Sequence, residues 1–357
     1  MTIKKGITGL IILLAFVTVG IQMYLQSHPL HAESWYGGNI YPSVRPILDE
    51  LHLPIPGLFL SIGLVLLILM TCFFIAFRKA KIWTALKYVA VLIAVLLTSF
   101  YWLWGFNYSR PDIVDRMGYN EMIPDTSWLF GESENVINRL NELRSMESLG
   151  YIGSLSREEI IKKNLDVTEL NSELEKILPS FKYNQKVKTN LHFIRPDGTL
   201  LHWSTAGIYW PFTGESNVDS GVHYLKKPVT ITHELAHAHG LTSEGDCNFV
   251  AYLACVQSDQ PLYEYSAHLS YIGYLLRDIL NNCGQNRLNE FYDKMDQAVI
   301  DDRRSIYEQH DQYSDYMPEL RNKIYDLFLK SQGVKGGIES YNYFVRLKYN
   351  MDLTRTE

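Results

Sequence analysis

The chain is poor in cysteine and has no excess of basic residues. Its 357 residues include four cysteines, and none of them forms a C-x-x-C pair, which argues against a thiolate zinc finger and a dithiol redox site. Cys247 and Cys255 would lie about 12 Å apart on a shared helix, too far for a disulfide. The formal net charge is -6, with Lys and Arg scattered through the polar part. Nucleic acid is therefore not an expected partner.

Apolar residues are concentrated in the first third of the chain. Three uncharged runs, at about residues 7–25, 57–77 and 88–106, are each long enough to cross a hydrocarbon core of about 30 Å as a helix. Buried helices of a soluble core are the alternative, but such helices are typically shorter and carry a polar stripe. We expect residues 1–106 to form a membrane anchor with three transmembrane helices, and the lipid bilayer to be a partner.

The basic residues beside these runs predict their orientation. Lys4 and Lys5 precede the first run, and residues 78–87 hold four basic residues, whereas residues 26–56 contain only Arg45. Because cytoplasmic flanks collect positive charge, we expect residues 107–357 to lie outside the cytoplasmic membrane. The first run can also be interpreted as a signal peptide, although the cleavage pattern before Ala32 is poor, and its removal would not change the side on which the rest lies.

Residues 107–357 have the composition of one polar domain. Apolar residues at intervals of three and four predict helices in SENVINRLNELRSM, in TELNSELEKILPSF and from Leu262 onward. Between them, KVKTNLHFI and TAGIYWPFTGESNVD are rich in aromatic and β-branched residues and are followed or interrupted by glycines, which indicates a small β-sheet. We expect an α+β fold in which a mostly helical domain carries a small β-sheet.

Residues 228–255, PVTITHELAHAHGLTSEGDCNFVAYLAC, predict a helix, a tight turn and a second helix. Pro228 suits a first helical position, Gly240 suits a left-handed cap, and Ser243 can cap the helix that follows. On the first helix His233 and His237 are four residues apart, so both imidazoles project from one face and can bind a single Zn²⁺. The alternative is that both are polar members of a buried helix face.

Glu234 stands beside the histidines in an H-E-x-x-H arrangement, which suits it to activate water as a general base. A catalytic zinc normally has three protein ligands, and Glu244 is the expected third, with Asn248 one turn later to support it. Asp246 is the alternative third ligand. Both acids also suit the first turn of a helix, where they favour the helix dipole or a cap without binding metal.

Three further residues are candidates for stabilising charge in a transition state. An oxyanion needs an additional donor, and Tyr265, His268 and His223 lie on segments that flank the motif. The stretch 207–219 is a candidate edge strand, along which a peptide substrate could align. The alternative is that its aromatic residues, Trp210 among them, belong to the core of the sheet.

The sequence HELAH, followed by Glu244, Asn248 and Ala251 in an E-x-x-x-N-x-x-A pattern, resembles the gluzincin peptidases. That resemblance implies zinc held by two histidines and a glutamate. In gluzincins the interval after the second histidine is usually longer, which keeps Asp246 open, and many have Asp where Asn248 stands. The overall plan more closely resembles a membrane family known as the domain of unknown function number 3810, through WLWGFNYSR, GIYWPFTGESNV, TITHELAHAHGLTSEGDCNFVAYLAC and YDLFLKSQGVKGGIESYNYFV.

Together these features predict a membrane-anchored, zincin-like zinc metalloendopeptidase, a hydrolase that cleaves a peptide or protein substrate with Zn²⁺ as cofactor. A catalytically inactive membrane sensor or scaffold is the alternative, and the intact Glu234 argues against it. Intramembrane proteolysis is disfavoured because the motif lies more than 120 residues beyond the third run. A transporter is disfavoured because the three runs carry no Asp, Glu, Lys, Arg or His that could mark a transport pathway.

Overall fold

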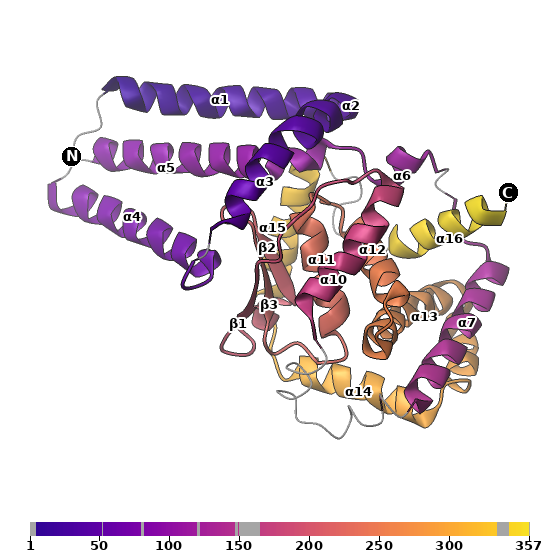
Figure 1. Ribbon diagram of the computed structural model, residues 1–357. Coiled ribbons are helices and arrows are strands. Elements are labelled where there is room, and N and C mark those ends of the chain that lie inside the picture. Colours follow the sequence, from indigo (N-terminus) through magenta and orange to yellow (C-terminus); the bar gives the residue numbers. More distant parts are fainter. Residues whose placement is uncertain are drawn as a thin grey trace. The chain divides into compact units, whose positions relative to one another are not determined.

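The computed structural model describes residues 5–51, 53–79, 82–119, 122–146, 149, 165–333 and 343–356 (Figure 1). The chain divides into two compact units, Met1–Pro111 with Tyr209–Glu215, and Asp112–Ile208 with Ser216–Glu357. In its described part the chain is mostly helical and has a small three-stranded sheet, as the sequence predicts.

Three helices of the first unit are long and apolar enough to cross a membrane. They are α1 (Lys5–Ser27), α4 (Gly57–Lys79) and α5 (Ile82–Leu103). α1 and α4 each pack against α5 (Figure 1). Most of the large apolar side chains of α1 and α4 are exposed. The expectation of three apolar spans is confirmed. Because so much apolar surface is costly in water, these helices indicate association with a membrane.

The third span differs from its expected bounds of 88–106. The helix begins earlier, at Ile82, and includes Lys87, because one charged residue near the start does not interrupt the helical run. It ends earlier as well, since Trp104 leaves the helical conformation (φ -159°) and Gly105–Ser109 form a 3₁₀ helix, η2. A Cβ on Gly105 would lie 2.5 Å from the Phe100 ring, so the chain passes closely over that ring.

Polar contacts hold the segment Tyr209–Glu215 in the first unit. Along the chain, α1 is followed by α2 (Pro29–His31), the π-helix η1 (Ala32–Ile40) and α3 (Tyr41–Asp49), which carries Arg45. The buried guanidinium of Arg45 donates to the Asp49 carboxylate and to the Tyr209 hydroxyl, both at 2.9 Å. The Glu215 carboxylate accepts a hydrogen bond from the Gly57 amide at 2.6 Å. A buried ion pair of this kind adds little net stability, because the cost of desolvation offsets much of the attraction.

The sheet consists of β1 (Leu191–Ile194), β2 (Gly207–Trp210) and β3 (Glu215–Asp219) in the order β1-β3-β2. β1 runs parallel to β3, with Leu191 opposite Ser216. β3 is buried along its whole length, and β2 lies at an edge. The expectation of one edge strand over 207–219 is therefore correct only for β2. The positive φ of Gly214 (+72°) lets the chain turn before β3.

The remaining helices of the second unit include one that packs against four others. They are α6 (Ile113–Met117), α7 (Thr126–Ser145), α10 (Val167–Ile177), α11 (Lys227–Ala238), α12 (Glu244–Gln257), α13 (Pro261–Tyr292), α14 (Gln297–Asp311), α15 (Pro318–Ser331) and α16 (Tyr343–Thr356), with the short 3₁₀ helices η3 (Leu178–Phe181) and η4 (Leu201–Trp203). α12 packs against α10, α11, α13 and α16 (Figure 1). Its buried residues, among them Phe249 and Tyr252, therefore lie at the centre of the hydrophobic core.

Candidate metal and catalytic site

The candidate site is built on the helix–turn–helix formed by α11 and α12. Gly240 adopts a left-handed conformation (φ +91°) after α11, and its amide donates to the carbonyl of His237 at 2.9 Å. The Ser243 hydroxyl then caps α12 by accepting from the amide of Asp246 at 3.3 Å. The predicted turn and both of its punctuating residues are confirmed, so the chain reverses tightly and α12 packs beside α11.

Two imidazoles and one carboxylate converge across this helix pair. The rings of His233 and His237 lie with their centroids 4.9 Å apart and nearly perpendicular, at 82°. Glu244 Oε2 lies 3.1 Å from Nε2 of His233 and 3.8 Å from Nε2 of His237. The three side chains are only 11–14% exposed. The structure thus brings together the two histidines and the glutamate that the sequence predicts as zinc ligands.

Each of the three converging side chains also makes a hydrogen-bond contact through its other nitrogen or oxygen atom. His233 Nδ1 lies 2.9 Å from the Asn248 side-chain oxygen, and His237 Nδ1 lies 2.9 Å from the Leu241 carbonyl. The Tyr325 hydroxyl donates to Glu244 Oε1 at 2.8 Å. Such outer partners fix the ring that they contact and direct its other nitrogen. The sequence predicts Asn248 as the support of Glu244, but its side-chain oxygen contacts His233, and Glu244 is contacted by Tyr325, which the sequence does not predict.

The local charges favour an ionised carboxylate at this point. Burial by itself would raise the pKa of Glu244, but the hydrogen bond with His233 and the charge of both imidazoles lower it to about 2. Burial lowers the pKa of His237. For His233 burial acts in the same direction, yet the bond with Glu244 raises the pKa overall. The arrangement is therefore a buried carboxylate facing two imidazole nitrogens.

The side chain of Glu234, on α11, faces Gly207 of the edge strand β2. Glu234 is almost fully buried, and its backbone carbonyl accepts a hydrogen bond from the Ser216 hydroxyl at 2.9 Å. A Cβ on Gly207 would lie 2.6 Å from both Cγ and Oε1 of Glu234. Real Cβ atoms do not approach so closely, so a larger residue at position 207 would have to displace the Glu234 side chain.

Cys247 is a neighbour of the histidines that the sequence reasoning missed. Ligand atoms of His233, His237 and Cys247 all lie within 4.8 Å of one another, and Sγ is 3.4 Å from His237 Nδ1. Burial raises the pKa of this thiol well above its ordinary value. The available signal was its position three residues after Glu244, which places both on one side of α12.

Asp246, the alternative third ligand, faces another part of the unit. Its Oδ2 accepts a hydrogen bond from the Ile113 amide, at the start of α6, at 3.0 Å. Two helical residues turn the side chain about 200° away from Glu244. Burial and the nearby Asp112 raise the pKa of Asp246 to about 8. Asp246 therefore contacts the start of α6 and the capping residue Ser243. The histidines face Glu244.

The three candidates for transition-state stabilisation have contacts on other helices. The Tyr265 hydroxyl donates to the Asp302 carboxylate at 2.7 Å. Nε2 of His268 lies 3.6 Å from the Glu264 carboxylate, and Nε2 of His223 lies 3.3 Å from the Ser305 hydroxyl. These partners belong to α13 and α14, whereas the converging histidines and carboxylate belong to α11 and α12. Proximity in sequence suggested these residues, and the contacts show that each is engaged by the packing of α13 and α14.

The contact between His268 and Glu264 leads to a prediction about pH. Burial opposes ionisation of Glu264, but bonds with His268 and Arg139 lower its pKa from 4.5 to about 2. A carboxylate with a lowered pKa stabilises the fold above pH ~4.5 and loses that effect as the pH falls toward 2. We expect Glu264→Gln to reduce stability by about 1 kcal/mol at pH 7, after allowance for solvent screening, with the difference shrinking below pH ~4.5.

Thermal unfolding of the full chain in detergent, followed from pH 3 to 7, measures this difference. Glu142→Gln is the matched control, because it removes the more exposed carboxylate on the same arginine, Arg139. We expect the control to change stability by less than about 0.5 kcal/mol. A constant difference between the parent and Glu264→Gln over the whole pH range would contradict the assignment.

Comparison with known proteins places the chain in a family. The family model described as "Protein of unknown function (DUF3810)" matches residues 36–349, which includes most of the chain and the whole candidate site. No curated protein matches, and no solved structure does. Since the match extends from η1 to α16, the chain belongs to the DUF3810 family of proteins of unknown function.

Proposed function

We propose that the chain is a membrane-anchored, gluzincin-like zinc metallopeptidase. The observation that carries the proposal is the convergence of His233, His237 and Glu244, each with a partner on its far side. Glu234 adds a buried carboxylate one residue after the first histidine. Two imidazoles, a carboxylate ligand and a neighbouring carboxylate base are the set that zinc-dependent peptide hydrolysis uses.

Two distances between donor atoms suit a zinc ion. Tetrahedral ligands at about 2.1 Å from zinc stand about 3.4 Å from one another, and the two distances from Glu244 Oε2, 3.1 and 3.8 Å, lie on either side of that value. Glu244 faces the Nε2 atoms of both histidines, whereas Cys247 contacts Nδ1 of His237, which already lies against the Leu241 carbonyl. This geometry favours Glu244 over Cys247 as the third ligand.

In the proposed hydrolysis the metal ligands, the base and the edge strand each have a different role. A zinc ion held by the three ligands would supply a Lewis acid that polarises the scissile carbonyl and acidifies water. The Glu234 carboxylate takes a proton from the attacking water and delivers it to the leaving amine nitrogen as the C–N bond breaks. Gly207 keeps space for that carboxylate, and the edge strand β2 offers main-chain groups to an extended peptide.

We further propose that residues 1–106 anchor the chain in the cytoplasmic membrane and that the domain of residues 107–357 lies outside. The distribution of Lys and Arg beside the apolar helices supports this orientation. A periplasmic-type reporter fused at the C-terminus should be active, and a cytoplasmic one inactive. The reverse pattern would invert the topology.

Metal analysis and peptide hydrolysis by the full chain in detergent test the function. We expect about one zinc per chain and cleavage of a randomised peptide library, with loss of cleavage after chelation and recovery when zinc is restored. Zinc without any cleavage would favour the inactive sensor or scaffold. A protein that never binds zinc would refute the site.

The contact between Gly207 and Glu234 yields a prediction of its own. In Gly207→Ala the new methyl group must displace the Glu234 carboxylate, since 2.6 Å leaves no room for it. A displacement of about 1 Å can lower kcat about 100-fold. We expect that loss with unchanged zinc content. Gly131→Ala in α7, where a Cβ meets nothing within 4 Å, is the control, and equal activities for the two variants would disprove the steric argument.

A further inference from the structure

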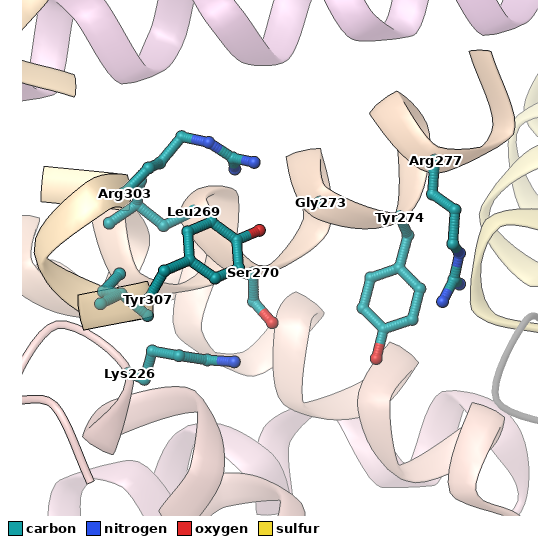
Figure 2. A pocket seen from close by; sticks show the side chains of 9 residues that line it. Lys226, Leu269, Ser270, Gly273, Tyr274, Arg277, Arg303 and Tyr307 are labelled. Carbon is teal, nitrogen blue, oxygen red and sulfur yellow. The ribbon is translucent and has the colours of Figure 1, made fainter. Parts of the chain in front are cut away.

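The second unit contains a cavity of about 540 Å³ between the start of α11, the middle of α13 and α14 (Figure 2). Its walls include three basic side chains and several hydroxyl groups, and its lining has no acidic residue. The polar lining residues are Lys226, Ser270, Tyr274, Arg277, Arg303 and Tyr307. In Figure 2 Lys226, Ser270, Arg303 and Tyr307 lie on one side of the cavity, and Tyr274 and Arg277 lie on the other.

Two of the cations of this pocket, Lys226 and Arg303, form no ion pair with the described part of the chain. Arg303 is only 7% exposed, and its buried Nε has no hydrogen-bond partner among the described residues. Burial and the nearby Arg303 both lower the pKa of Lys226, so the two positive charges oppose each other. Partly buried cations are costly unless an anion or a set of hydrogen bonds compensates them.

Neighbouring carboxylates are engaged elsewhere. Asp302, adjacent to Arg303 in sequence, lies 2.6 Å from Arg144 and accepts a hydrogen bond from Tyr265. Asp301 pairs with Arg304 at 3.1 Å. Asp278 follows Arg277 in sequence, and its charge interacts with that arginine and with Arg346. The side of the pocket formed by Lys226 and Arg303 therefore keeps an excess of positive charge.

Two hydrogen-bonded residues, Tyr274 and Asn248, connect the pocket to the candidate zinc site. The Tyr274 hydroxyl, in its wall, accepts from the Asn248 side-chain nitrogen at 3.3 Å, and the Asn248 oxygen contacts His233. Lys226 directly precedes α11, and His233 follows it by seven residues on that helix. The helical rise between the two residues is about 10 Å. A short stretch of extended peptide could therefore reach from one place to the other.

We propose that this pocket binds a carboxylate of the peptide substrate and so positions the bond to be cleaved. The inference rests on the proposed function and names its substrate class: peptides with a free carboxyl group, from the C-terminus or an acidic side chain, a few residues from the cleaved bond. Lys226 and Arg303 supply the positive charge, and Ser270 and Tyr307 supply hydroxyl donors. Guanidinium and ammonium groups make short, charge-assisted hydrogen bonds to such oxygens.

Binding can be measured without hydrolysis, so a failure of this inference is distinguishable from a failure of the proposed function. The full chain carrying Glu234→Gln is titrated in detergent against fluorescein-labelled random peptides in three matched pools. The pools are free acids without Asp or Glu, the corresponding C-terminal amides, and amides that carry one Glu. Fluorescence anisotropy gives Kd for each pool.

We expect the amide pool without Glu to bind about tenfold more weakly than the free acids. Recovery of affinity in the amide pool with Glu would show that an acidic side chain also serves as the ligand, and no recovery would restrict the ligand to the C-terminus. In Arg303→Gln, and in the less buried variant Lys226→Gln, the difference between acids and amides should shrink toward onefold.

Arg304→Gln is the matched control, because Arg304 is the next residue on α14, is exposed and does not line the cavity. It should retain the tenfold preference. Equal affinity of the first two pools for the parent, with no gain in the third, would overturn the proposal. So would a preference that survives Lys226→Gln, a variant whose altered side chain is less buried than Arg303.

Discussion

Glu234→Gln should lower the rate of peptide hydrolysis by about 10²–10⁴-fold and leave the zinc content unchanged. Glutamine keeps the size of the side chain that packs against Gly207, but its amide cannot take the proton of the attacking water. Zinc is retained because the converging donor atoms belong to His233, His237 and Glu244. Rate and zinc content are measured on the same preparation.

Glu308→Gln serves as the control for this change, since Glu308 is an exposed residue of α14. It should hydrolyse the same peptides at the parental rate. Equal rates for the parent and Glu234→Gln would exclude Glu234 as the base, whatever the metal content. Loss of zinc in Glu234→Gln would instead assign to this carboxylate a part in holding the metal.

Glu244→Ala should release zinc and abolish hydrolysis. The substitution removes the oxygen that faces both imidazole nitrogens and leaves two protein ligands. Tyr325→Phe and Asn248→Ala are the graded comparison, because they remove only the partner of a ligand and should weaken zinc binding about 10–100-fold. The loss in Glu244→Ala should exceed that range when zinc affinity is measured by competition with a chelator.

Asp246→Asn tests the alternative ligand in the same assay. Its carboxyl faces the Ile113 amide, so the variant should bind zinc as the parent does. Cys247→Ser should also retain zinc, because Sγ contacts the nitrogen of His237 that lies against Leu241. Zinc that survives Glu244→Ala and disappears in Asp246→Asn or Cys247→Ser would move the third ligand to that residue. Circular dichroism of each variant separates loss of metal from loss of fold.

The parts of the site that could be predicted from sequence are those determined by local rules. The spacing of His233 and His237 on one helix, the cap at Gly240 and the position of Glu244 on the next helix all fall within 12 residues. Helical periodicity and turn chemistry determine which of these side chains can meet. The same holds for the three apolar helices, whose length and composition alone distinguish them.

The parts that could not be predicted depend on tertiary packing. Tyr325 reaches Glu244 from 81 residues further along the chain, and no local pattern marks that tyrosine among the others of the sequence. The basic pocket likewise combines Lys226 with Arg303, which share no motif. Conversely, Tyr265 and His268 lie near the motif in sequence, but α13 directs them to Asp302 and Glu264.

The strand β2 has a practical consequence for work on this protein. Gly207 packs against Glu234, and two residues later Tyr209 accepts a hydrogen bond from Arg45. A shortened chain without Met1–Pro111 would remove Arg45 and also Gly57, the partner of Glu215. A soluble fragment prepared in that way would therefore lose the support of the strand that borders the proposed base, and its inactivity would say little about the intact protein.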